Sequence, residues 1–154
     1  MLDILAVFIA RDLIFLLVIG GVIVLVLTTK KDKMKLGKLG ALSFGLALLL
    51  SRLVSLIYFN PRPFVEQGIT PLIAHAANNG FPSDHALLGF TLASVVYVYN
   101  KKMGACFFLV AAAIGASRVY LSIHSPEDIV GSLVIAVIAV ALASMIIRRH
   151  WKTV

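Results

Sequence analysis

Apolar runs long enough to cross a bilayer recur along almost the whole chain, and they limit the possible folds more than any other feature. A transmembrane helix needs roughly 17–25 mainly apolar residues, and 60% of the 154 residues are hydrophobic. The third run, His85–Tyr99, is short, so we expect it to begin in the interface or to borrow flanking residues. Residues 2–10 are expected to form an interfacial helix or to extend the first span, Asp12–Thr28. The sequence predicts an all-α, polytopic transmembrane helix bundle in which residues 1–154 form a single domain. The five predicted spans are Asp12–Thr28, Leu36–Phe59, His85–Tyr99, Gly104–Leu121 and Ile129–Ile147.

The basic residues predict how this bundle is oriented. With five spans, three basic clusters all fall on one face, which the positive-inside rule makes cytoplasmic. The net charge of +7 is then explained by topology and by contact with anionic membrane lipids, and nucleic acid is not an expected partner. Ten of the fourteen lysines and arginines belong to these clusters: Lys30, Lys31, Lys33, Lys35 and Lys38; Lys101 and Lys102; Arg148, Arg149 and Lys152.

The four remaining basic residues are all arginines, and they lie toward the opposite face or within a span. The same topology brings polar residues from distant segments to that outer face. This convergence predicts a site at the outer face of the membrane. Its expected members are Arg62, Ser83, His85, Ser117, Arg118, His124 and Asp128, with Arg11 and Arg52 as the other unclustered arginines.

Two predicted helix starts indicate which ligand this site takes. Ser83 is placed to cap the third span, and Ser125, followed by Pro126, to cap the fifth. Unpaired N–H groups at such starts bind anions, and the forked guanidinium groups of Arg62 and Arg118 suit phosphate oxygens. Because a neutral histidine can attack phosphorus while a second protonates the leaving oxygen, the sequence favours phosphoryl chemistry over phosphate binding alone.

Three short motifs in this region resemble the signatures of the phosphatidic acid phosphatase type 2 superfamily. They are "RP" at Arg62–Pro63, "PSDH" at Pro82–His85, and "SRVYLSIHSPED" at Ser117–Asp128. The third has the family spacing of Ser-Arg, five residues, His, three residues and Asp. Within the superfamily, "HAANNGFPSDHA" looks like the bacitracin-resistance type of bacterial undecaprenyl pyrophosphate phosphatase, which regenerates the carrier lipid of cell-wall (peptidoglycan) synthesis.

The resemblance implies a role for each matching residue. His124 would attack phosphorus and form a phosphohistidine, Asp128 would fix its tautomer, and His85 would act as the acid and then the base. The implied substrate is a polyprenyl pyrophosphate lipid, hydrolysed at the extracytoplasmic face of a bacterial cell membrane. No metal and no cofactor is implied. The implied phosphate-binding residues are Arg62, Arg118, Ser83 and Ser117.

One position departs from the family pattern. The first motif normally has a lysine seven residues before its arginine, where this chain has Ser55. Arg52, about one helical turn away, could snorkel toward the phosphate in its place. If Arg52 does not reach the phosphate, this site has one cation fewer than the corresponding site in other family members.

Other interpretations of these residues and of the substrate stay open. Asp128 could act only as the capping-box partner of Ser125. Phosphatidylglycerol phosphate or phosphatidic acid could replace the polyprenyl substrate, and a lipid-phosphate binder or transporter without enzymatic activity is a third alternative. His75, Glu66 and Asn78 have no assignable role in the long loop, so we expect them at the surface.

Overall fold

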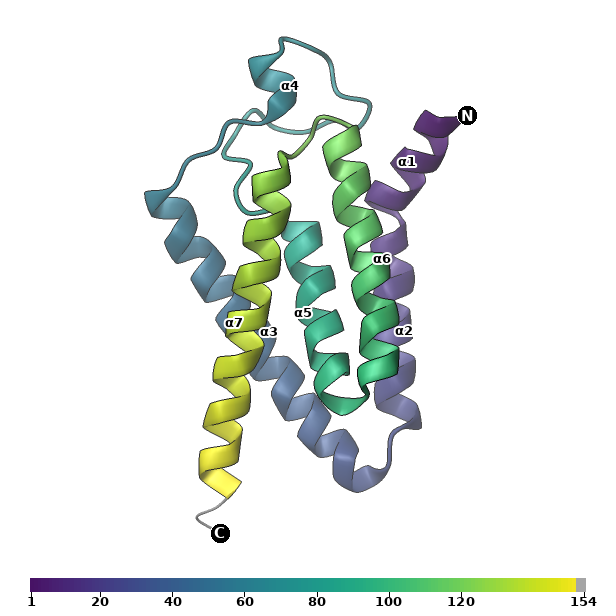
Figure 1. Ribbon diagram of the computed structural model, residues 1–154, viewed down its shortest axis with the longest axis vertical. Helices are drawn as coiled ribbons and strands as arrows, with labels where there is room; N and C mark the ends of the chain where they lie inside the picture. The colour runs from purple at the N-terminus through teal and green to yellow at the C-terminus, as the bar shows by residue number, and fades with distance from the viewer. Residues whose placement is uncertain (152–154) are drawn as a thin grey trace.

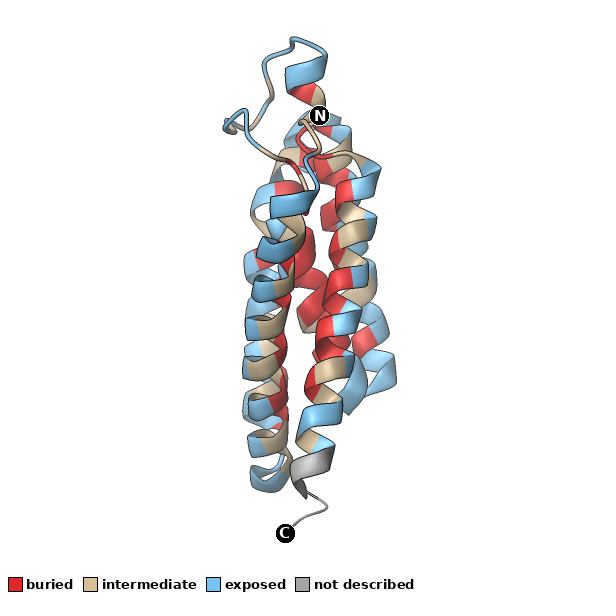
Figure 2. Ribbon diagram, turned by 90° about the vertical axis from the view of Figure 1, so that its left-hand side faces the viewer, coloured by how far each residue is buried: buried red, intermediate tan, exposed pale blue. Residues whose placement is uncertain are grey.

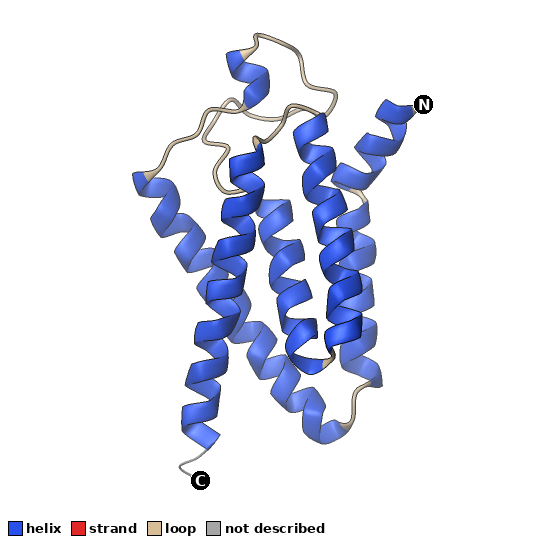
Figure 3. Cartoon of the chain, in the orientation of Figure 1, coloured by secondary structure: helices blue, strands red, loops and turns tan. Residues whose placement is uncertain are grey.

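The structure, a computed structural model, describes residues 1–151, with side chains up to Arg148. In the third basic cluster, Lys152 and the side chain of Arg149 lie outside the described residues. The described residues form helices but no strands, apart from an isolated antiparallel bridge between Pro61 and Asn79 (Figures 1 and 3). The helices are α1 (Leu2–Arg11), α2 (Leu13–Leu27), α3 (Lys30–Ile57), α4 (Pro63–Glu66), α5 (Asp84–Tyr99), α6 (Lys101–Tyr120) and α7 (Pro126–Trp151).

The helices confirm the predicted all-α membrane bundle. Among the described helices, α3, α6 and α7 are each long and apolar enough to cross a membrane. Helices α1 and α2, with 10 and 15 residues, pass the same test only as a pair, and this pair is bent by 43°. Helix α5 is apolar but has 16 residues. Each predicted span corresponds to one helix, while five complete crossings remain a prediction.

Two helices begin earlier than predicted because polar residues cap them. Helix α3 starts at Lys30 instead of Leu36, where the Thr29 hydroxyl accepts a hydrogen bond from the backbone N–H of Asp32. Helix α6 starts at Lys101, because the Asn100 side chain accepts from the N–H of Met103 at 3.0 Å. The lysine clusters at these positions therefore lie within helices and not in loops.

The N-terminal residues form a helix of their own, and both expected alternatives, an interfacial helix or an extension of the first span, stay predictions. Helix α1 ends at Arg11, and α2 continues in a new direction after Asp12. The buried Ala6 and Ala10 of α1 pack with Leu121 and Ile123, which follow α6. Helix α1 is thereby fixed against the same turn that carries the third motif.

The two ends of the bundle carry different groups. One end holds the lysine-rich start of α3, the α5–α6 turn and the C-terminal part of α7 (Figure 1). The other end holds the long segment from α3 to α5, which includes α4, and the short turn from α6 to α7 (Figure 1). The described residues of the basic clusters and the three motifs thus occupy opposite ends of the bundle, as predicted.

Helix α5 lies in the middle of the bundle, and this explains how a short helix can be accommodated there. Residues such as Leu87, Phe90 and Val95 are buried on several sides of α5, while the outer helices expose apolar side chains such as Phe15 and Leu109 (Figure 2). A helix that is apolar all round is typical of a fully enclosed position. Its first turn starts deeper along the bundle axis than the ends of α6 and α7 (Figure 1).

Candidate active site

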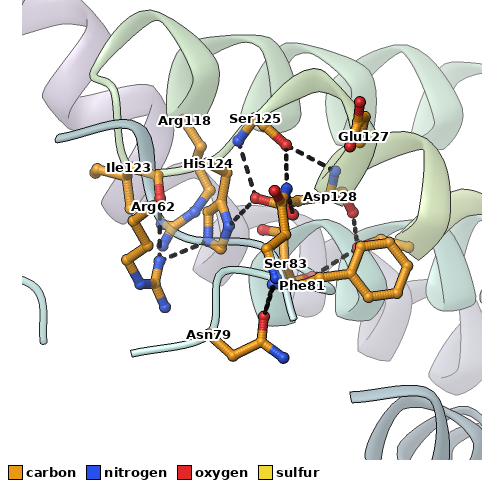
Figure 4. A network of polar contacts seen from close by, with 12 residues as sticks. Arg62, Asn79, Phe81, Ser83, Arg118, Ile123, His124, Ser125, Glu127 and Asp128 are labelled. Atoms are coloured by element: carbon orange, nitrogen blue, oxygen red, sulfur yellow. Dashed lines mark hydrogen bonds and ion pairs between the residues drawn. The ribbon is translucent and has the colours of Figure 1, made fainter. Parts of the chain in front are cut away.

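Segments that are far apart in the sequence meet above the first turn of α5 (Figure 4). They are the stretch from Asn60 to Arg62, the residues before α5, and the turn between α6 and α7. The Gly80 N–H donates to the Asn60 carbonyl at 2.8 Å, which pairs the first two segments. The Ser83 N–H approaches the Asp128 carbonyl at 3.5 Å and brings the second segment to α7. All three family motifs therefore converge, as the span count predicted.

A tight turn after α6 sets the position of His124. The Arg118 carbonyl accepts from the N–H groups of both Ile123 and His124, at 3.1 and 3.3 Å. Ser122 adopts a left-handed conformation, with φ of 57°, which an L-residue adopts at a cost. Its carbonyl accepts from the Phe64 N–H at 2.9 Å, so α4 holds the turn from outside. The chain thereby reverses within five residues and brings His124 beside the start of α7.

His124 and Asp128 form a buried pair. The Nδ1 of His124 lies 3.1 Å from Oδ2 of Asp128, and both side chains are almost fully buried. A carboxylate only accepts hydrogen bonds, so Nδ1 carries the proton and Nε2 keeps its lone pair. Burial lowers the pKa of His124; its hydrogen bond to Asp128 opposes this shift, while the charges of Arg118 and Arg62 add to it. A neutral imidazole whose Nε2 keeps its lone pair is the form that can attack phosphorus.

Asp128 makes the contacts of both of the roles that the sequence left as alternatives. Its Oδ2 also accepts from the Ser125 N–H at 2.9 Å, and the Ser125 hydroxyl accepts from the Asp128 N–H at 3.4 Å. This is the predicted capping box at the start of α7. Capping and imidazole orientation use the same oxygen, so helix α7 and His124 are fixed together.

Asn60 is a member of the network that the sequence analysis missed. Its Nδ2 donates to Oδ1 of Asp128 at 2.9 Å and lies 2.7 Å from the Ser125 hydroxyl oxygen. Asn79 holds Asn60 in place, because its Oδ1 accepts from the backbone N–H groups of Asn60 and Phe81, each at 3.0 Å. The signal available in the sequence was the position of Asn60, two residues before the arginine of the first motif.

Gly80 lets this network close. A Cβ at position 80 would lie 3.0 Å from Oδ2 of Asp128 and 3.1 Å from the Asn60 carbonyl oxygen. Neither neighbour can retreat easily, because one is a backbone atom and the other is tied to His124. Glycine is needed here for close backbone approach.

Arg62 reaches the free face of His124 (Figure 4). Its Nη1 donates to the Ile123 carbonyl at 3.1 Å and lies 3.3 Å from Nε2 of His124. Its Nε donates to Oδ1 of Asn78 at 3.0 Å, so Asn78, expected only at the surface, contacts the site. The guanidinium thus lies where oxygens of a phosphate attacked by His124 would be placed.

Arg118 is nearly enclosed, with 2% of its surface exposed. Its Nη1 donates to the Ala10 carbonyl, at the end of α1, and its Nη2 to Nε2 of His75, both at 3.0 Å. Its Nε is buried without a hydrogen-bond partner. His75, which was expected at the surface, is therefore a third histidine of the site. Only Glu66, of the three loop residues without an assigned role, is exposed and away from these contacts.

The start of α5 completes the arrangement. Ser83 is fully buried, and its hydroxyl makes neither a capping bond nor any other hydrogen bond. That hydroxyl and the first N–H groups of α5 are therefore available to an anion. His85 follows in the first turn, half-buried and close enough to Arg118 and His124 for their charges to affect it. The start of α5 thus offers a hydroxyl and N–H groups to an anion, and His85, which can carry a proton, lies in the same turn.

Two predicted phosphate ligands are not brought into this arrangement. The Ser117 hydroxyl donates instead to the Ala6 carbonyl of α1 at 3.2 Å. Arg52 is exposed on α3, and its guanidinium makes none of the hydrogen bonds or ion pairs found among the described residues. Ser117 thus fastens α1, and Arg52 makes no contact with the other site residues, so no contact among the described residues supports either expected phosphate-binding role.

Comparison with known proteins agrees with the motifs. The PAP2 superfamily model matches residues 37–152. Undecaprenyl-diphosphatase BcrC of Bacillus subtilis (strain 168) is 38% identical over 91 residues, 59% of this chain and 47% of the relative. Putative undecaprenyl-diphosphatase YbjG of Escherichia coli (strain K12) is 32% identical over 143 residues, 92% of this chain and 72% of the relative.

A third relative carries a different name. Bacitracin transport permease protein BcrC of Bacillus licheniformis is 27% identical over 133 residues, 86% of this chain and 65% of the relative. The chain thus spans about half the length of the Bacillus subtilis relative and slightly less than two thirds of this one. The family match covers most of the chain and includes all three motifs, so this protein belongs to the PAP2 superfamily.

Proposed function

We propose that this protein is a membrane-bound hydrolase that cleaves undecaprenyl diphosphate to undecaprenyl phosphate and inorganic phosphate. The observation that carries the proposal is the pairing of His124 with Asp128 on one side and Arg62 on the other. This geometry supplies an oriented nucleophile and a cation for the phosphoryl oxygens at one point. Two of the relatives are named as undecaprenyl-diphosphatases, which supports this choice of substrate.

In the first chemical step, Nε2 of His124 attacks the terminal phosphorus. The bond from phosphorus to the bridging oxygen breaks, and His85 gives its proton to that oxygen as undecaprenyl phosphate leaves. Arg62 and Arg118, with the Ser83 hydroxyl, bind the non-bridging oxygens, on which negative charge is spread. Asp128 stabilises the charged, phosphorylated imidazole through Nδ1.

In the second step, water hydrolyses the phosphohistidine. The deprotonated His85 takes a proton from the attacking water, the bond from phosphorus to Nε2 breaks, and inorganic phosphate leaves. His124 and His85 return to their starting states. The scheme uses neither a metal nor a cofactor.

The reacting residues argue for an enzyme over a lipid-phosphate binder or transporter. Binding would require the arginines and the helix start, but it would not require a histidine oriented by a buried carboxylate. Among phosphatases, the lipid tail and the bond that is cleaved distinguish undecaprenyl diphosphate from phosphatidylglycerol phosphate and phosphatidic acid. In all three His124 would attack a terminal phosphorus, but the first substrate presents a phosphoanhydride and the other two a phosphomonoester.

Phosphate release from a panel of lipids in detergent tests the proposal. We expect the purified protein to prefer undecaprenyl diphosphate to phosphatidylglycerol phosphate and phosphatidic acid. His124→Ala should abolish release while the protein stays folded, and Glu66→Gln, at an exposed loop position, is the matched control. A preference for phosphatidic acid would assign the chain to the other lipid phosphatases, and no release from any lipid would refute an enzymatic role.

The site is proposed to face the outside of a bacterial cell membrane, because the basic clusters lie at the opposite end of the bundle. Cysteine reporters at Gln67 and Lys102, both exposed and at opposite ends, test this in a variant that lacks Cys106. An impermeant reagent added outside should label position 67 and spare position 102. The reverse pattern would place catalysis in the cytoplasm and remove the role in recycling the cell-wall carrier lipid.

A further inference from the structure

Arg118 has an unusual environment for a buried cation. Its guanidinium is held by two neutral acceptors, the Ala10 carbonyl and the His75 imidazole. No described carboxylate forms an ion pair with it, and Nε has no partner. A buried charge is stable only when it is paired or well hydrogen-bonded, so the geometry of Arg118 depends on these two acceptors.

His75 is the acceptor that belongs to a side chain, and it can accept only when it is neutral. Protonated imidazole has two donors and no acceptor. The surroundings favour the neutral form, because burial lowers the pKa of His75 and the charges of Arg118 and Arg62 lower it further, with the Ile73 carbonyl opposing. The other histidine whose charge affects its pKa is His124, and His75 in turn is close enough to His85 on α5 to affect that residue.

We propose that His75 is a positioning residue for Arg118. By accepting from Nη2, the imidazole holds the guanidinium against the Ala10 carbonyl and leaves Nε–H for the phosphate. His75 then acts on phosphoryl transfer through Arg118 and not through its own contact with the substrate. The inference rests on the proposed phosphatase function, and it assigns a catalytic purpose to a loop histidine outside the three motifs.

Three substitutions at position 75 separate this role from general loop packing. In glutamine the side-chain oxygen lies about where Nε2 lies in histidine, whereas in asparagine it corresponds to Nδ1. His75→Gln should therefore keep kcat/KM within about 3-fold of the unmodified protein. His75→Asn and His75→Ala should lose about 10- to 100-fold, as expected for a lost hydrogen bond to a charged group. Ala77→Ser, at an exposed position of the same loop, is the control.

Inhibition by orthovanadate, which mimics the transferring phosphoryl group, gives a second measurement that does not depend on lipid binding. Asparagine and alanine should weaken inhibition about as much as they lower kcat/KM, and glutamine should restore it. All variants should keep the same thermal midpoint in detergent within a few degrees. Full activity of folded His75→Ala, or equal losses in the glutamine and alanine variants, would overturn the proposal.

A double-mutant cycle tests whether the effect passes through Arg118. Arg118→Lys keeps the charge but has no Nη2. In that background, adding His75→Asn should lower kcat/KM by less than about 2-fold. A further loss as large as in the unmodified background would show that His75 contacts the substrate itself and would overturn the positioning role. If the unmodified protein also releases no phosphate, the proposed function fails first. Turnover that depends on His124 but is indifferent to His75 refutes only this inference.

Discussion

Asn60→Ala removes a side-chain amide that connects the segment before Arg62 to the proposed catalytic pair of His124 and Asp128. Its Nδ2 lies 2.9 Å from Oδ1 of Asp128 and 2.7 Å from the Ser125 hydroxyl oxygen. Asp128 is fully buried, so water cannot easily replace the lost donor. A hydrogen bond to a charged group contributes about 1.5–3 kcal/mol. If that contribution is fully expressed in the transition state, kcat/KM should fall about 10- to 150-fold.

The assay is phosphate release over a range of substrate concentrations, together with thermal unfolding in detergent. Asn60→Asp should be more damaging than Asn60→Ala at neutral pH, because it places a second carboxylate against Asp128. Asn78→Ala is the comparison, since Asn78 contacts Arg62 and not Asp128. If Asn60→Ala keeps kcat/KM within 2-fold and unfolds at the normal temperature, Asn60 does not support the catalytic pair.

Three further predictions follow from single contacts. Because the pKa of His124 is lowered from 6.5 and only its neutral form attacks, the acidic limb of kcat/KM should be centred below pH 6.5; an acidic limb centred above 6.5 would contradict this. Arg52→Ala should leave kcat/KM within about 2- to 3-fold of normal, because the exposed guanidinium does not contact the site; a loss above 30-fold in the same assay would show that Arg52 reaches the phosphate after all. Gly80→Ala should destabilise the protein by about 1–3 kcal/mol through overpacking and reduce turnover, since its Cβ would crowd Asp128 and the Asn60 carbonyl; an unchanged thermal midpoint would show that the loop relaxes freely.

The helices could be predicted from the sequence because their signals are local. Apolar runs mark the buried and lipid-facing segments, and Ser125 with Pro126 marks the start of α7. The start of α3 was missed because hydropathy begins at Leu36, whereas the helix begins at its Thr29 cap. Side chains at helix ends are polar, so apolar periodicity cannot detect the first turn.

The contact between His124 and Asp128 was implied by the family resemblance, and its physical basis is also local. His124 and Asp128 are four residues apart on either side of a helix start, so the local turn brings them together. Capping and imidazole orientation were treated as alternatives for Asp128. They coexist because one carboxylate oxygen accepts from two donors.

The missed contacts depend on segments that meet only in the folded chain. Ser117 and Arg118 both bond to carbonyls of α1, more than 100 positions earlier in the sequence. No local pattern indicates that α1 packs there, so Ser117 was expected to bind phosphate. His75 reaches Arg118 only because of the path of the long loop. A lone histidine in a loop gave no sign of that path.

The account requires a covalent intermediate at His124, and trapping it is the most direct test. The purified protein would be mixed with undecaprenyl diphosphate radiolabelled in its terminal phosphate, quenched in alkali within one turnover, and digested for peptide analysis. Phosphohistidine is stable in alkali and labile in acid, so label should appear on the peptide that contains His124, disappear on a chase with unlabelled substrate, and be absent from His124→Ala. Rapid phosphate release with no label on any peptide would mean that water attacks phosphorus directly, and it would contradict the assignment of His124 as the nucleophile.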